Sequence, residues 1–124
     1  MKIKPRTLKI VEKPWGKEEI WGYVEDKYLG KTITIDEGHR LSRQYHKTKE
    51  ETIYVINGSL RLELGWNPDS QIPEKIEILN IGDFFHIRPG LIHRFCAHDG
   101  TVTLCEVSTY YPDDVVRLDD DYGR

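Results

Sequence analysis

The stretch that decides the fold is ETIYVINGSLRLEL at residues 51–64. Apolar and polar residues alternate on both sides of Asn57-Gly58, a pair preferred in two-residue β-turns. Residues directly opposite each other in a hairpin share a face, so this turn predicts that Glu51 lies opposite Leu64 on the apolar, inward face. A lone carboxylate in an apolar interior is costly without a positive partner. We therefore expect a metal ion or a buried base beside Glu51.

Short runs of strand-forming residues recur along the rest of the chain, separated by turn signals. The runs are KTITI at 31–35, ETIYVI at 51–56, SLRLEL at 59–64, KIEIL at 75–79, DFFHI at 83–87, HRFCA at 93–97 and TVTLCEV at 101–107. Such spacing, with no long helical period, predicts an all-β sandwich or barrel. A chain of 124 residues suits one domain with a core and a cavity for a small ligand.

A second hairpin is predicted across Asp99-Gly100. If this turn has two residues, His93 lies opposite Glu106 and both side chains share one face. A histidine and a carboxylate would then lie together on the inner side of the barrel.

The overall composition describes an ordinary globular protein. Hydrophobic residues make up 38% and charged residues 31%, and the formal net charge of −3 gives no reason to expect a nucleic-acid partner. The start of the chain lacks the apolar stretch of a signal peptide and no later run reaches membrane-spanning length, so we expect a cytoplasmic protein without a membrane partner. Cys96 and Cys105 are then expected to be reduced core thiols.

Four side chains with metal-binding atoms recur at suggestive spacing: Gln44, His46, Glu51 and His93. Residues 44 and 46 differ by two, so both side chains point to one face of an extended strand. Imidazoles and carboxylates bind first-row divalent metals, and the amide oxygen of Gln44 is a weaker neutral donor. The set predicts a divalent metal site and leaves Zn, Mn, Fe, Co and Ni open.

This spacing resembles the two sequence motifs of the cupin superfamily. The first motif corresponds to residues 38–58 and the second to residues 82–93. Three departures are visible: Gln44 stands where a histidine is usual, Arg88 where a proline is usual, and Ala97 where an asparagine is usual. The resemblance implies a single-domain cupin, a double-stranded β-helix or jelly-roll barrel, and it implies that the four side chains named above are the metal ligands.

Further segments resemble the cupin domain of type II mannose-6-phosphate isomerases. They are KPWG at 13–16, KTITI at 31–35, RLSRQYH at 40–46 and the tail DVVRLDDDYGR at 114–124. The resemblance covers nearly all of residues 13–124 and implies a metal-dependent aldose-ketose isomerase that interconverts mannose 6-phosphate and fructose 6-phosphate. In larger members the cupin follows a nucleotidyltransferase domain; this chain lacks one, so we do not expect pyrophosphorylase activity.

Isomerisation between C1 and C2 of a sugar needs a base and a stabiliser for the developing negative charge, a part that a divalent metal can play. For the base we look first to Glu106, whose alternative role is to orient His93. His86 is a second candidate acid or base, with packing in a strand as its alternative role.

Phosphate binding requires cationic or backbone donors at the mouth of the barrel. The candidates near the motifs are Arg40, Arg43, Lys49, Arg88 and Arg94, and Arg117 or Arg124 could reach the mouth from the tail. For each of them the competing interpretation is a solvated surface charge. The expected partner is a small phosphorylated sugar.

Residues 1–12 form an N-terminal arm ahead of the cupin domain at 13–124, whose C-terminal segment would close the barrel. Small cupins often form homodimers by exchanging an N-terminal strand, and this arm could serve that way. Two other functions remain open: a metal-containing cupin that binds a sugar or sugar nucleotide without turnover, and an iron-dependent oxygenase.

Overall fold

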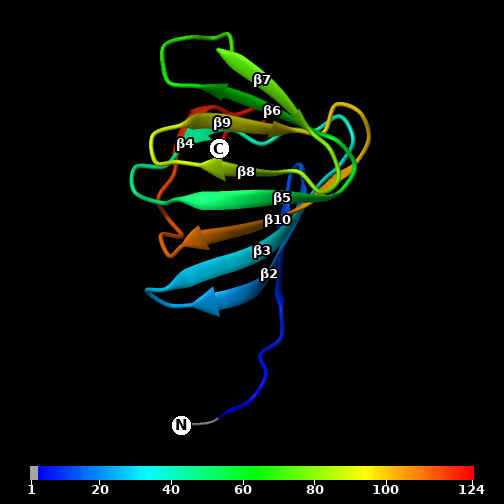
Figure 1. Cartoon of the computed structure of the whole chain (residues 1–124), viewed down its shortest axis with the longest axis vertical. Helices are drawn as coiled ribbons and strands as arrows, with labels where there is room; N and C mark the ends of the chain where they lie inside the picture. Colours follow the sequence, from blue (N-terminus) through cyan, green and yellow to red (C-terminus); the bar gives the residue numbers. More distant parts are fainter. Residues whose placement is uncertain (1–2) are drawn as a thin grey trace.

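The chain folds into two antiparallel β-sheets that pack face to face (Figure 1). The computed structural model describes residues 3–124. The strands of the described residues are β1 (Lys9–Lys13), β2 (Gly16–Val24), β3 (Tyr28–Ile35), β4 (Arg43–Tyr45), β5 (Glu51–Asn57), β6 (Leu60–Gly65), β7 (Lys75–Leu79), β8 (Phe84–Ile87), β9 (Ile92–Cys96), β10 (Val102–Thr109) and β11 (Val116–Asp119). Every predicted run coincides with a strand to within three residues at either end.

The two sheets contain six and five strands. The first has the order β1-β2-β3-β10-β5-β8 and the second has the order β11-β4-β9-β6-β7. From β3 onward the chain crosses repeatedly between the sheets, so most neighbours in a sheet, β6 and β7 excepted, are distant in sequence, as expected of a jelly roll. The predicted all-β, single-domain barrel is confirmed. Within residues 3–124 there is no helix long and apolar enough to cross a membrane.

The core lies between the inner faces of the sheets, where alternate residues of each strand meet. In β5 and β6 alternate positions are buried (Glu51, Ile53 and Val55; Leu60, Leu62 and Leu64), as the period of two predicts. The largest fully buried side chains are Trp15, Ile33, Ile35, Ile53, Val55, Leu60, Leu62, Ile87, His93, Phe95, Val102 and Leu104. Among these, His93 is the polar exception, and it marks the functional end of the barrel.

The predicted hairpin across Asn57-Gly58 is wrong in its pairing. β5 lies between β10 and β8, and β6 lies between β9 and β7, so Glu51 and Leu64 are in different sheets. Gly58 has a φ of 81°, and a Cβ at this position would lie 2.4 Å from the backbone oxygen of Thr101. The turn therefore carries the chain from one sheet to the other. The inward direction of Glu51 was nevertheless predicted correctly, because alternation determines the face of a residue whichever strand lies beside it.

The predicted hairpin across Asp99-Gly100 fails for the same reason. β9 pairs with β4 and β6, while β10 pairs with β3 and β5. His93 lies opposite Gln44, and Glu106 lies opposite Lys31. Both His93 and Glu106 still point inward and are buried.

The N-terminal arm is only partly separate from the barrel. Residues 9–13 form β1, which pairs with β2 of the same chain at the edge of the six-stranded sheet, so the boundary predicted after residue 12 falls inside a strand. Residues 1–2 of the arm lie outside the described residues. Exchange of the arm between two copies stays a prediction.

The two cysteines are free thiols in different sheets. Cys96 is buried, in agreement with the expectation of a core thiol. Cys105 is only half-buried, because it points to the outer side of β10, where its sulfur lies 3.8 Å from the Thr32 hydroxyl. The description as a core thiol is therefore wrong for Cys105.

Candidate metal centre

Three of the four predicted ligands converge inside the barrel. His46 follows β4, Glu51 begins β5 and His93 lies in β9, and all three are buried. One ligand atom from each lies within 4.8 Å of the other two. Oε1 of Glu51 is 3.5 Å from Nε2 of His46 and 3.4 Å from Nε2 of His93. Residues from both sheets thus present two nitrogens and one oxygen to a common point.

Backbone carbonyls orient both imidazoles. Nδ1 of His46 donates to the carbonyl oxygen of Asp114 at 2.6 Å, and Nδ1 of His93 donates to that of Leu91 at 2.9 Å. A carbonyl can only accept, so each Nδ1 carries a proton and each Nε2 is free to offer its lone pair toward Glu51. Such second hydrogen bonds are typical of metal-binding histidines.

The electrostatics of the three side chains fit a cation. Nε2 of His93 is buried and has no hydrogen-bond partner within residues 3–124. Burial lowers the pKa of His93 to about 4, so its imidazole is neutral at pH 7. Neutral nitrogen lone pairs that face a carboxylate oxygen repel it unless a positive charge lies between them. A divalent ion suits this donor set, and the structure leaves its identity open.

Gln44 lies next to this cluster. It pairs with His93 across β4 and β9, and its side chain lines the same cavity as His46 and Glu51. The prediction that residues 44 and 46 share a face is therefore confirmed. Coordination by the Gln44 amide stays a prediction.

A buried lysine ties the ligand Glu51 to Glu106. Nζ of Lys49 is 3.3 Å from Oε2 of Glu51 and 3.2 Å from Oε2 of Glu106. Nζ of Lys31 lies 3.8 Å from the same oxygen of Glu106 and 2.9 Å from Glu18. The two oxygens of Glu51 are thus divided: Oε1 faces the histidines and Oε2 faces the ammonium group.

The two carboxylates have opposite protonation preferences. Burial alone would raise the pKa of Glu51, but the positive charge of the neighbouring Lys49 contributes to holding that pKa below its usual range. Burial, and then the negative charge of Glu51, raise the pKa of Glu106 above the usual range of a glutamate. Separated pKa values in neighbouring carboxylates are a common feature of acid-base sites.

These groups line a cavity of about 180 Å³ at one end of the barrel. Its walls combine apolar core residues with a ring of charged side chains. The lining residues include Lys13, Trp15, Glu18, Lys31, Gln44, His46, Lys49, Glu51, Phe95, Glu106, Asp114, Arg117 and Arg124. The prediction that Arg117 and Arg124 could reach the mouth from the tail is confirmed, and Nε of Arg124 is held 2.9 Å from Asp120.

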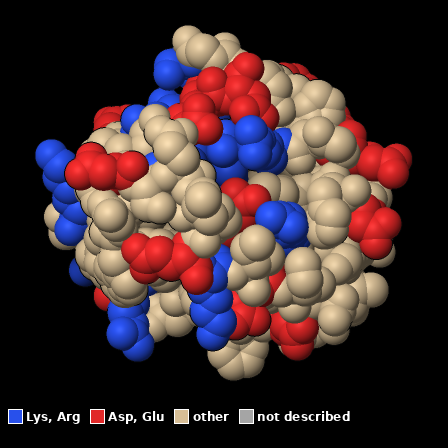
Figure 2. Space-filling model, turned by 90° about the horizontal axis from the view of Figure 1, so that it is seen from above, with Lys and Arg blue, Asp and Glu red and all other residues tan. Residues whose placement is uncertain are grey.

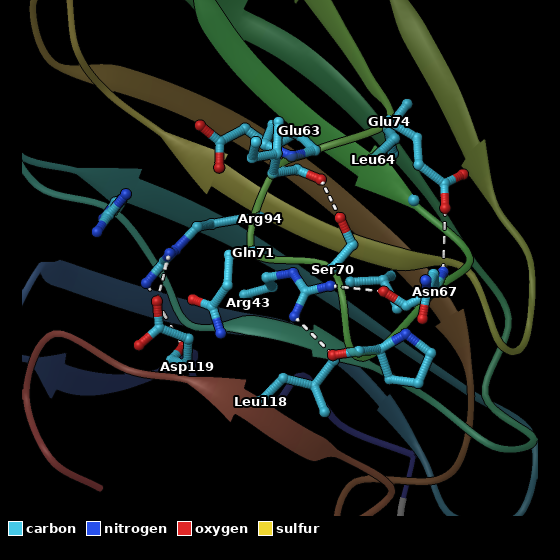
Figure 3. Close-up of a pocket in the computed structure, with 16 residues that line it drawn as sticks. Arg43, Glu63, Leu64, Asn67, Ser70, Gln71, Glu74, Arg94, Leu118 and Asp119 are labelled. Carbon is cyan, nitrogen blue, oxygen red and sulfur yellow. Dashed lines mark hydrogen bonds and ion pairs between the residues drawn. The ribbon is translucent and has the colours of Figure 1, made fainter.

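Three predicted phosphate-binding arginines lie elsewhere, around a second pocket of about 350 Å³ (Figure 3). Arg43 and Arg94 alternate with inward residues, so they point to the outer side of the five-stranded sheet. Arg43 donates to the Asn67 carbonyl at 3.0 Å, and Arg94 lies 3.2 Å from Asp119. The third, Arg40, forms two hydrogen bonds with Asp121.

Carboxylates pair with Arg40 and Arg94, and backbone carbonyls accept from Arg43. The structure therefore places all three away from the cavity at whose mouth they were expected to bind phosphate. Acidic and basic side chains also lie side by side near the centre of the face seen in Figure 2, with no extended area of one sign.

Two other candidates also lie outside the metal cavity. His86 is about half exposed on the outer side of β8, where its side chain contacts Glu50. Arg88 lines a separate surface pocket with Trp66. Alternation again explains the outward direction of His86, because its neighbour Ile87 is fully buried. The structure therefore places His86, the candidate acid or base, and Arg88, a candidate phosphate ligand, outside the cavity in which they were expected to act.

Sequence reasoning missed Lys31 on the inner wall and the part of Asp114, and it named Lys49 as a phosphate ligand rather than as the buried partner of Glu51 and Glu106. Lys31 lies within a predicted strand, but only the pairing of β3 with β10 places it beside Glu106. The carboxylate of Asp114 accepts three backbone hydrogen bonds, from residues 47, 48 and 49. Burial alone would raise the pKa of Asp114, but these hydrogen bonds outweigh it and lower the pKa to about 2.

Comparisons with known proteins agree with this architecture. The model of the cupin domain family matches residues 31–109. A mannose-1-phosphate guanylyltransferase from Salmonella montevideo is 30% identical over 124 residues, which cover 95% of this chain and 24% of that protein. The chain therefore spans about a quarter of the length of this curated relative.

Solved structures show the same fold at low identity. The capsular polysaccharide assembling protein CapF from Staphylococcus aureus superposes with a TM-score of 0.74 at 15% identity, over 92% of this chain and 32% of that one. KdgF from Halomonas sp. superposes with a TM-score of 0.70 at 18% identity, over 87% of this chain and 89% of that one. With the matched residues, the two-sheet barrel and the inward histidines and glutamate in agreement, the chain belongs to the cupin family.

Proposed function

We propose that this protein binds a divalent metal ion through His46, Glu51 and His93, with Gln44 as a fourth ligand, and isomerises a phosphorylated sugar. Mannose 6-phosphate and fructose 6-phosphate are the leading pair. The observation that carries the proposal is the convergence of three metal-binding side chains next to the buried Glu106 in one cavity. The relative from Salmonella supports the sugar, because its name concerns another phosphate of mannose.

The reaction needs a group that stabilises negative charge and a base, and the cavity offers residues for both. The metal, when bound, would supply a Lewis acid that stabilises negative charge developing on the sugar oxygens. Glu106 is the base that moves a proton between C1 and C2, and its raised pKa suits a group that must both accept and return a proton near neutral pH. Lys49 holds the Glu106 carboxylate in place from 3.2 Å.

The phosphate is bound at the mouth by cationic residues. Arg117, Arg124 and Lys13 line the cavity there, whereas Arg40, Arg43 and Arg94 are engaged on the outer side of the five-stranded sheet. Arginine binds phosphate oxygens through paired N–H donors, so Arg117 is the first candidate for the phosphate. Arg124 lines the same cavity and is already paired with Asp120.

A non-catalytic sugar-binding protein is the second candidate. It is favoured by one observation: Glu106 is already engaged by Lys49 and lies 3.8 Å from Lys31, an arrangement that also suits a structural ion-pair network. A binding protein would recognise the phosphorylated sugar with the same mouth residues and without proton transfer.

The test is a coupled assay of the purified protein loaded in turn with Zn, Mn, Co, Fe or Ni. Mannose 6-phosphate is supplied and fructose 6-phosphate is detected, while calorimetry measures sugar-phosphate binding. Turnover that disappears in Glu106→Gln supports the isomerase; binding without turnover by any metal form supports the binding protein. Arg117→Gln should raise KM at least tenfold, and Arg43→Gln, a matched change in the second pocket, should leave KM unchanged.

A further inference from the structure

Asp114 lies between the C-terminal tail and the metal centre and contacts both through two different groups. Its backbone carbonyl accepts the Nδ1 hydrogen of His46 at 2.6 Å. Its carboxylate accepts the backbone N–H groups of Lys47, Thr48 and Lys49 at 3.0, 2.7 and 2.8 Å. One residue thus makes four hydrogen bonds to the segment that joins the ligands His46 and Glu51.

These contacts decide where His46 can point. The backbone of His46 is also held from the other side, since the Gly90 N–H donates to its carbonyl at 2.7 Å. With the Asp114 carbonyl on Nδ1, the lone pair of Nε2 is directed at Glu51. Without the carboxylate of Asp114, the N–H groups of residues 47–49 would lose their acceptor and the carbonyl of residue 114 would no longer be held beside Nδ1. The ring of His46 could then rotate.

The same residue begins the tail. Two residues after Asp114 the chain enters β11, in which Val116 pairs with Tyr45 and Arg117 pairs with Gln44 on β4. Farther along, Arg124 lines the mouth of the cavity. The residue that holds His46 therefore also anchors the start of the tail.

We propose that Asp114 is a positioning residue that couples metal binding to docking of the tail at residues 115–124. The inference rests on the metal binding proposed above, but it does not require isomerase activity. Coupling between two equilibria is reciprocal: a metal that needs the His46 orientation set by Asp114 must stabilise the docked tail by the same factor. The metal thereby organises the residues that bind the phosphate, although it lies deeper in the barrel.

The experiment combines metal affinity with hydrogen exchange. Zinc binding to the metal-free protein is measured by competition with a chromogenic chelator, and amide exchange of residues 115–124 is followed by mass spectrometry with and without zinc. We expect zinc to slow exchange in the tail of the parent protein. Asp114→Ala keeps the backbone carbonyl that accepts from His46 and removes the carboxylate that holds residue 114 against residues 47–49. We expect it to weaken zinc binding about 10- to 100-fold, the usual effect of losing an interaction that supports a metal ligand, and to abolish the protection of the tail.

Two further variants separate coupling from a general loss of structure. Asp114→Asn keeps one acceptor oxygen and should weaken zinc binding less than Asp114→Ala does. Asp113→Ala changes the exposed neighbour and should leave both readouts as in the parent. Slow exchange of the β10 amides verifies that each variant is folded.

Each outcome bears on the inference. The inference is overturned if Asp114→Ala binds zinc as tightly as the parent does, or if zinc does not change amide exchange in the tail. It is also overturned if the parent binds no metal. Zinc binding with the expected coupling but without sugar turnover would overturn the isomerase and leave the coupling standing.

Discussion

Replacing Lys49 by methionine should destabilise the metal-free protein strongly. The ammonium group lies 3.3 Å from Glu51 and 3.2 Å from Glu106, and both carboxylates are almost fully buried. Methionine fills a similar volume, but among residues 3–124 it leaves the two imidazoles beside Glu51 and Lys31 as the nearest cation to Glu106. Removing one partner from a buried ion pair costs about 3–5 kcal/mol, because the remaining charge is uncompensated.

The assay is urea denaturation of parent and variant in the presence of a chelator. The deficit should be larger at pH 8 than at pH 5. Burial and the charge of Glu51 already raise the pKa of Glu106, and the loss of Lys49 raises it further. A carboxyl group with a raised folded-state pKa is stabilising while it holds its proton and loses that contribution as the pH rises.

Adding a divalent metal should restore part of the folding stability that Lys49→Met loses. A metal at 100 times its dissociation constant stabilises the folded state by about 2.7 kcal/mol in the parent, and by more in Lys49→Met, where the added cation meets uncompensated carboxylates. Lys75→Met is the matched control: its exposed ammonium pairs with Glu77 at 2.9 Å, so its loss should cost at most ~1 kcal/mol. Equal stability of Lys49→Met and the parent at pH 8 would refute the assignment of Lys49 as the buried counter-charge.

Three further results are expected. In the native protein at pH 8 a thiol reagent should modify Cys105 and spare Cys96, because burial and then the charge of Glu63 raise the Cys96 pKa to about 11; equal labelling rates would contradict the structure. Gly58→Ala should unfold at lower urea than Gly82→Ala although both glycines have positive φ, since a Cβ at 58 meets a backbone oxygen at 2.4 Å and at 82 meets nothing within 4 Å. His86→Ala should keep the parent's pH profile of sugar turnover, because the imidazole lies outside the cavity. A shifted profile would mean that His86 takes part in proton transfer.

The sequence alone determined the strands, the faces and the candidate metal ligands. Alternation over residues 51–64 placed Glu51 on the inner side whichever strand lay beside it, because the direction of a side chain depends on local backbone geometry. The same local rule placed Gln44 and His46 on one face. Resemblance to the cupin motifs then identified His93 as the residue that joins them, which periodicity cannot do for residues so far apart in sequence.

Only the tertiary structure decided which strands are neighbours. A turn such as Asn57-Gly58 fits a hairpin and a crossing between sheets equally well, and the choice depends on burying both inner faces of the barrel at once. That choice put Lys31 beside Glu106, turned Arg43 and Arg94 away from the metal, and brought Asp114 to His46 across 68 residues of chain. Partners distant in sequence follow from the global packing of the sheets, which no local pattern of residues encodes.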